Sequence, residues 1–165
     1  MKKTIFALIV LLVSASVSLQ AQESKIRAGA GLVYATDINN LGLALKGVYT
    51  INPEWEGAFG FTHILKKDYV SYNIVDLDAH YVFAQTSDEM SFYGLAGLAL
   101  NFWKVDYEDL GWGLGGTATG SDAGLNLGVG MNYLLSSNLR LVPEVRFTIL
   151  DGSFARLGAT VQYSF

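Results

Sequence analysis

The sequence contains no cysteine, so the chain has neither a disulfide scaffold nor a thiolate metal site. Basic residues are also scarce: 11 lysines and arginines stand against 15 aspartates and glutamates, and the formal net charge is −4. That balance excludes the basic surface by which proteins bind nucleic acid. After residue 21 no uninterrupted apolar run approaches the ~20 residues of a transmembrane helix. Hydrophobic residues nevertheless make up 51% of the chain, so they are dispersed in shorter segments.

The amino terminus has the composition of a secretory signal peptide. Lysines at positions 2 and 3 precede an apolar run, and a group of mostly small residues follows. Basic, apolar and small residues in that order are typical of a segment that is removed after export. We expect cleavage after Ala21, with cleavage after Ser18 or an uncleaved anchor helix as alternatives. The chain then divides into a signal peptide, residues 1–21, and one barrel domain, residues 22–165.

The rest of the chain alternates between apolar and polar or small residues at a period of two, which is typical of β-strands with unlike faces. The alternating segments are 25–34, 41–51, 55–65, 72–83, 91–103, 123–133, 139–150 and 156–165. Each is about as long as the 9–11 residues with which a tilted strand crosses a bilayer. An even number of strands is what bacterial single-chain barrels have. The pattern predicts an all-β fold, an eight-stranded antiparallel up-and-down transmembrane β-barrel.

A soluble barrel of the lipocalin type would also alternate, but it places its apolar face inside. Here the face opposite the apolar one carries charge, as at Asp76 and Asp78, so the apolar face suits lipid. Segment 91–103 is apolar on both faces. We expect Leu98 to point outward and Asn101 and Trp103 to point inward there.

The two prolines predict local features. Asn52-Pro53-Glu54 predicts a tight turn, because proline fixes φ and asparagine caps the turn through its side chain. Pro143 lies inside the segment 139–150 and cannot donate a ladder hydrogen bond, so we expect a bulge or a local gap there.

The carboxy-terminal segment carries a recognisable pattern. Arg156 and Gly158 precede hydrophobic and aromatic residues at Val161, Tyr163 and Phe165, and the chain stops on that phenylalanine. The pattern resembles the carboxy-terminal assembly signal of bacterial outer-membrane β-barrels. The resemblance implies that the barrel-insertion machinery and periplasmic chaperones act on this chain during assembly.

The whole mature chain resembles the group of small barrels formed by the OmpA transmembrane domain, OmpX-like proteins and other porin-family outer-membrane β-barrels. The residues that carry this resemblance are the alternating segments 77–83 and 125–131 together with the terminal strand. It implies a location in the outer membrane of a Gram-negative-type bacterium, in contact with outer-membrane lipid and lipopolysaccharide. The functions of such proteins include envelope integrity, adhesion and immune evasion, so the resemblance leaves the extracellular partner unknown.

Charged residues of both signs fall on the inward face of the predicted barrel. They are Lys25, Arg27, Lys46, Glu56, Asp76, Asp78, His80, Arg140, Glu144, Arg146 and Arg156. Opposite charges enclosed together should pair, because an unpaired buried charge costs several kcal/mol. We expect a charge network that fills the lumen, and with it a role in envelope structure or surface interaction. The alternative is a narrow porin-like path whose lining charges select small solutes or ions.

Neither histidine predicts catalysis. His63 falls on the outward face near a predicted loop, and His80 lies beside Asp76 and Asp78. Neither is followed by the serine of the His-x-Ser arrangement found in lipid A deacylases, and no nucleophile adjoins a base. We therefore expect no enzyme activity, no cofactor and no metal site.

Aromatic residues cluster toward both ends of the predicted strands. One predicted interfacial belt, near the short turns and the carboxy terminus, comprises Tyr49, Trp55, Tyr81, Phe83, Phe92, Tyr133, Tyr163 and Phe165. A thinner second belt comprises Tyr34, Tyr72, Phe102 and Trp103. Short turns and termini then face the periplasm, and the connections at 35–40, 66–71, 104–122 and 151–153 face outside. We expect the long loop at 104–122 to be the variable functional surface.

Overall fold

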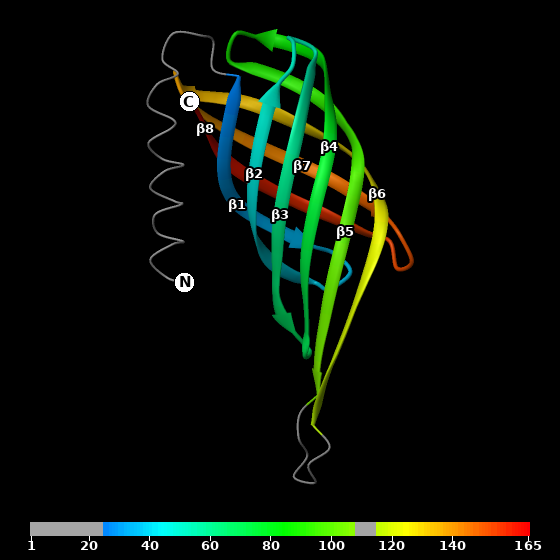
Figure 1. Ribbon diagram of the computed structural model, residues 1–165. Helices are drawn as coiled ribbons and strands as arrows, with labels where there is room; N and C mark the ends of the chain where they lie inside the picture. The colour runs from blue at the N-terminus through cyan, green and yellow to red at the C-terminus, as the bar shows by residue number, and fades with distance from the viewer. Residues whose placement is uncertain (1–24, 108–114) are drawn as a thin grey trace, which may run out of the picture.

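The computed structural model describes residues 25–107 and 115–165, and these form eight strands in a closed antiparallel barrel (Figure 1). The strands are β1 (Ile26–Ala35), β2 (Asn40–Thr50), β3 (Trp55–Lys67), β4 (Val70–Ser87), β5 (Met90–Tyr107), β6 (Gly116–Ser136), β7 (Leu139–Ile149) and β8 (Phe154–Ser164). Neighbours in the sequence are neighbours in the sheet, and β8 pairs with β1 to close the ring. The predicted fold is confirmed. The predicted signal peptide lies outside the described residues and stays a prediction.

The strands present a large apolar face outward. Exposed apolar side chains on successive strands include Leu32, Leu45, Phe59, Leu77, Leu98, Leu127, Phe147 and Leu157. In β5, whose two faces look alike in the sequence, Leu98 is exposed and Asn101 is buried, as expected. This outer face is the one that lipid covers in a membrane barrel. Within the described residues no helix is long and apolar enough to cross a membrane.

The turn between β2 and β3 is capped by its asparagine. Asn52 Oδ1 accepts hydrogen bonds from the backbone nitrogens of Glu54, at 3.0 Å, and Trp55, at 2.9 Å. The side chain thereby satisfies two amide groups that the tight turn leaves without a ladder partner. The predicted turn at Asn52-Pro53-Glu54 is confirmed.

Pro143 interrupts the ladder between β6 and β7 without a bulge. Pairing stops at Gly130–Glu144 and resumes at Tyr133–Leu141 in the same register. On the other side of the strand, Pro143 remains paired with Ala159 of β8. The predicted feature is therefore a local gap, because proline offers no N–H to β6.

The predicted loop at 104–122 is wrong in its bounds. β5 continues through Val105 to Tyr107, β6 begins at Gly116, and the two strands pair as far as Tyr107–Gly116. Threonine and valine favour a strand on both sides of this hairpin, which outweighs the glycines that suggested a loop. The hairpin reaches beyond the other strands at the lower end of Figure 1. Its tip, residues 108–114, lies outside the described residues.

The second aromatic belt is partly wrong. Phe102 is exposed on the outer face, and Tyr34 lies on the same face as Leu32. Tyr72 instead packs inside the barrel against a cluster of buried apolar residues, and the indole of Trp103 points into the barrel mouth. Both residues share the strand parity of inward neighbours, so alternation outweighs the tendency of aromatic rings to sit at the membrane interface.

The first aromatic belt lies where it was predicted, at the turn end of the barrel. Exposed members include Tyr49, Trp55, Tyr81 and Phe83. The rings of Trp55 and Tyr81 contact each other with centroids 5.0 Å apart.

Candidate functional site

The candidate site is the polar interior of the barrel, and its side chains come from alternate positions of several strands. Inward glycines leave the space that larger neighbours fill. A Cβ on Gly130 would lie 2.2 Å from the ring of Tyr93, and a Cβ on Gly97 would lie 2.4 Å from Asp78 Oδ1. Small residues on one strand therefore let long side chains from the next cross the lumen.

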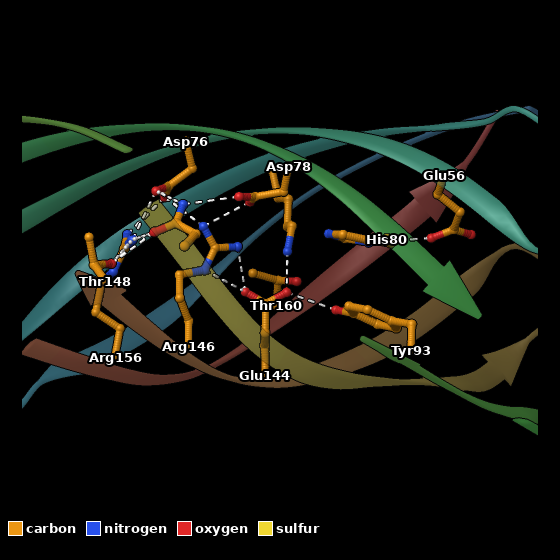
Figure 2. A network of polar contacts seen from close by, with 12 residues as sticks. Glu56, Asp76, Asp78, His80, Tyr93, Glu144, Arg146, Thr148, Arg156 and Thr160 are labelled. Atoms are coloured by element: carbon orange, nitrogen blue, oxygen red, sulfur yellow. Dashed lines mark hydrogen bonds and ion pairs between the residues drawn. The ribbon is translucent and has the colours of Figure 1, made fainter. Parts of the chain in front are cut away.

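The deepest group surrounds Asp76 on β4 (Figure 2). Arg156 of β8 binds this carboxylate at two points, Nη1 to Oδ2 and Nη2 to Oδ1, both at 2.8 Å. Asn126 Nδ2 donates to Asp76 Oδ1 at 2.8 Å, and Thr148 Oγ1 donates to Asn126 Oδ1 at 2.8 Å. All four side chains are at least nine-tenths buried. A carboxylate with this many donors is a satisfied buried charge.

A second group centres on Arg146 of β7. Its Nη1 lies 2.8 Å from Asp78 Oδ2 and 3.0 Å from Asp76 Oδ2, and its Nη2 lies 2.7 Å from Glu144 Oε1. Lys46 forms an ion pair with the other oxygen of Glu144, and Tyr93 Oη donates to the same oxygen at 2.8 Å. Three carboxylates and two cations thus share one connected cluster, which joins the Asp76 group through Arg146.

A third group lies nearer the turn end. Arg27 donates to Glu56 at two points, Nη1 to Oε1 at 2.8 Å and Nη2 to Oε2 at 2.9 Å. His80 Nδ1 lies 3.5 Å from Glu56 Oε2, and its ring stacks on Tyr93 with centroids 4.4 Å apart. The stacked rings connect this group to the Glu144 cluster, as Figure 2 shows.

Nine of the eleven residues expected on the inward face thus lie together inside the barrel. The structure does not bring Lys25 into the network. Lys25 directly precedes β1, is exposed, and lines a vestibule of about 730 Å³ at the turn end. Arg140, also expected on the inward face, lines the same vestibule and forms no ion pair within the described part of the chain.

Sequence reasoning missed an apolar layer that crosses the lumen at the loop end. We call it the apolar plug, and its buried members are Val33, Ala35, Ile64, Ile74, Ala99 and Phe154. Ala35, Ile64, Ile74 and Ala99 have no exposed surface. The signal that could have found it is parity: Ile74 is two residues from Asp76, so both must face the lumen.

Between its two ends, the part of the lumen lined by described residues holds little free space. The cavity among Lys46, Asp76 and Arg156 measures only about 50 Å³. The vestibule at the turn end measures about 730 Å³, and a second cavity at the loop end measures about 340 Å³. The charge network and the apolar plug separate these two open ends.

The two histidines lie in different places. His63 is on the outer face, where Nδ1 lies 2.8 Å from Asn73 Oδ1. His80 is buried against Glu56 and Tyr93. Among the described residues, no group of three or more His, Asp or Glu side chains is arranged to hold a metal ion.

The residues of the predicted assembly signal occupy both faces of β8. Val161, Tyr163 and Phe165 are exposed on the outer face, and the last two rings meet edge to face with centroids 5.2 Å apart. Gly158 faces inward, where a Cβ would lie 2.7 Å from the carbonyl oxygen of Leu32. The glycine therefore permits close approach of β8 to β1.

Comparison with known proteins identifies the architecture. The model of the family described as "Outer membrane protein beta-barrel domain" matches residues 5–165. The N-terminal β-barrel domain of Pseudomonas aeruginosa OprF superposes with a TM-score of 0.68 at 18% identity, covering 87% of this chain and 100% of that one. Neisserial surface protein A gives a TM-score of 0.66 at 20% identity, covering 85% and 96%. Ail, the attachment invasion locus protein of Yersinia pestis, gives 0.60 at 20% identity, covering 85% and 96%. A search of curated protein sequences gave no match.

Proposed function

Because the chain belongs to the family of outer membrane proteins with a β-barrel domain, we propose that it acts in envelope structure or surface interaction through its external loops, with a lumen closed to solutes. Its location is the outer membrane. There its outer face contacts lipid and lipopolysaccharide, and the barrel-insertion machinery and periplasmic chaperones assist its assembly through the terminal strand.

The apolar plug is the observation that carries this proposal. Its side chains cross the lumen at the loop end, next to the Asp76–Arg156 group. An ion that entered from the loop end would lose its water shell against Ile64, Ile74 and Phe154, which offer no polar atom in return. Below them the opposite charges are already paired with one another. Eight-stranded barrels are narrow enough for side chains to fill them in this way.

The shape of the loop end supports a role in surface interaction. β5 and β6 remain paired as far as Tyr107–Gly116, beyond the residues where β6 leaves β7 at Leu125–Ile149. The hairpin therefore presents a segment outside the rest of the barrel (Figure 1). One protein with the same fold, Ail, is named for attachment and invasion.

A narrow diffusion channel is the second candidate. The two open ends, of about 730 Å³ and 340 Å³, would be its vestibules, and the paired charges between them its selective region. Exchange of partners within the Glu144 cluster, where Lys46, Arg146 and Tyr93 compete for one carboxylate, would be the step that opens it.

Planar-bilayer recording of the refolded protein tests the proposal. A closed barrel leaves the membrane electrically silent at moderate voltage, whereas a channel gives steady unitary steps. Insertion is checked in the same preparation by the heat-modifiable gel mobility of folded barrels. Steady steps from fully folded protein would overturn the closed-lumen proposal in favour of the channel.

A further inference from the structure

The loop end of the barrel contains a cavity with an acidic and aromatic lining. The cavity measures about 340 Å³. Its aromatic lining residues are Tyr72, Trp103 and Phe154, and its charged lining residues are Asp37, Asp122 and Asp151. Among the described residues that line it, none is a lysine or arginine. The opening of this cavity, which we call the mouth, therefore carries three acidic side chains around an aromatic floor formed by Tyr72, Trp103 and Phe154.

The strands fix the indole of Trp103 in this mouth. A Cβ on Gly120, its cross-strand partner, would lie 2.2 Å from the indole ring, so the ring occupies the space above that glycine. Trp103 Nε1 donates to Asp122 Oδ2 at 3.1 Å. One oxygen of Asp122 is thereby held in place by a neutral donor, which brings no opposing charge to the mouth.

Asn101 adds an acceptor at the base of the cavity. Its side chain is 3% exposed and lines the cavity, and its Oδ1 has no hydrogen-bond partner within the described residues. A buried acceptor without a donor is energetically costly, because it has given up its hydrogen bonds to water. A ligand that brings an N–H to this oxygen recovers that cost. The side chains of Asn101, Asp37, Asp122 and Asp151 all offer oxygen acceptors to the cavity.

We propose that this mouth binds a linear polyamine, an organic cation with ammonium groups separated by methylene segments. The ammonium groups match the acidic rim and the unpaired oxygen of Asn101, and the methylene segments match the aromatic floor. Cations are also attracted to the faces of tryptophan and tyrosine rings. An anion is disfavoured by the three aspartates.

The lining suits an organic cation better than a metal ion. Within the described residues no three acidic side chains converge as metal ligands, so the aspartates are spread around the mouth. A linear polyamine with several ammonium groups can reach carboxylates that lie far apart. One Mg²⁺ ion needs all its oxygen ligands at about 2.1 Å.

The positive groups near the mouth are engaged elsewhere. Lys66 and Lys104 each form an ion pair with Asp106, and Lys67 Nζ donates to the carbonyl oxygen of Asn39. Beneath the floor, Arg156 lies 5.6 Å from the ring centre of Phe154 but is paired with Asp76. None of these pairings neutralises Asp37, Asp122 or Asp151. The site does not depend on whether the lumen conducts, because it lies on the loop side of the apolar plug, which contributes Phe154 to its lining.

Isothermal titration of the refolded full-length protein in detergent, with spermidine as the probe, tests the proposal. We expect spermidine to bind at one site, with an affinity that decreases as salt is added, because exposed charges are screened. The double variant Asp37→Asn/Asp122→Asn should lose roughly thirtyfold in affinity, since each of the two lost contacts between unit charges is worth ~1 kcal/mol and ~1.4 kcal/mol is a factor of ten. Asparagine keeps an oxygen that can accept from Trp103, so the mouth should retain its shape.

The matched control removes two charges from the opposite end, in the turn between β4 and β5. The variant Asp88→Asn/Glu89→Gln has the same net charge as the test variant, and both should keep the heat-modifiable mobility of the folded barrel. Unchanged spermidine affinity in the control, with the loss confined to the mouth variant, supports the site. Equal losses in both variants, no binding at millimolar spermidine, or complete competition by equimolar Mg²⁺ would overturn it.

Discussion

Arg27 and Glu56 face each other across the turn end of the lumen in a two-point ion pair, with contacts of 2.8 Å and 2.9 Å. Both side chains are almost completely buried. Their geometry is the parallel arrangement in which guanidinium and carboxylate bind most strongly.

Removing one partner of this pair should destabilise the barrel. Glu56→Gln leaves Arg27 buried without its counter-charge, and the expected loss is about 3 kcal/mol in the free energy of unfolding. Urea titration of the protein folded into lipid vesicles measures it. The exposed pair Lys66–Asp106 supplies the control, where Lys66→Gln should leave the unfolding midpoint nearly unchanged. Equal effects at both pairs would contradict the assignment of Arg27–Glu56 as a buried pair.

The apolar plug should behave as a packed core. Ile74→Ala leaves a space that the surrounding strands cannot close, with an expected loss of about 3 kcal/mol. Leu77→Ala, on the lipid face of the same strand, should cost roughly 1–2 kcal/mol, because lipid fills the space and only the transfer term remains. The measurement is again equilibrium unfolding from lipid. If the plug were loosely packed, Ile74→Ala would cost less free energy of unfolding than Leu77→Ala.

Gly130 should tolerate no side chain. A Cβ there would overlap the ring of Tyr93, so Gly130→Ala should displace that ring from Glu144 and cost about 1–3 kcal/mol. Gly94 is the matched control, because a Cβ on it meets no atom within 4 Å. Gly94→Ala should therefore unfold at nearly the wild-type urea concentration. Unfolding midpoints that shift equally in the two variants would argue against the contact.

The hairpin tip should be dispensable for folding. Deleting residues 108–114 leaves the pairing of β5 with β6 up to Tyr107–Gly116 intact, so heat-modifiable mobility should persist. Any adhesion or serum-resistance phenotype of cells carrying the protein should be lost. A deletion through residue 118 would also remove paired residues of β6, so the shorter deletion is the sharper one. Loss of folding in the shorter deletion would show instead that residues 108–114 are required for the stability of the barrel.

Alternation at a period of two predicted the architecture well, because lipid outside and charge inside give opposite demands on neighbouring residues. It predicted the faces of Leu98 and Asn101 even where both faces of β5 are apolar. The same alternation assigned charged residues of both signs to the inward face of the barrel. Which carboxylate meets which arginine depends on strand register and on side-chain reach across the ring, and neither follows from spacing along one strand.

Three features lie beyond the sequence pattern for identifiable reasons. Tyr72 combines an aromatic ring, which favours the membrane interface, with inward parity, and the structure shows that parity prevails. The extension of β5 and β6 depends on pairing between two segments that each look weak alone. The plug was overlooked because apolar inward residues such as Ile64 are few on each strand and gather only when the ring closes.

The seam between β1 and β8 also sets the timing of assembly. It joins residues at the two ends of the domain: Arg27 Nε donates to Gln162 Oε1 over a separation of 135 residues. Contacts so distant in sequence form slowly, because a long chain must first be drawn together. A chain released before β8 is made would keep two open sheet edges, which are sites of unwanted pairing. The terminal strand therefore determines when the molecule stops being vulnerable to aggregation.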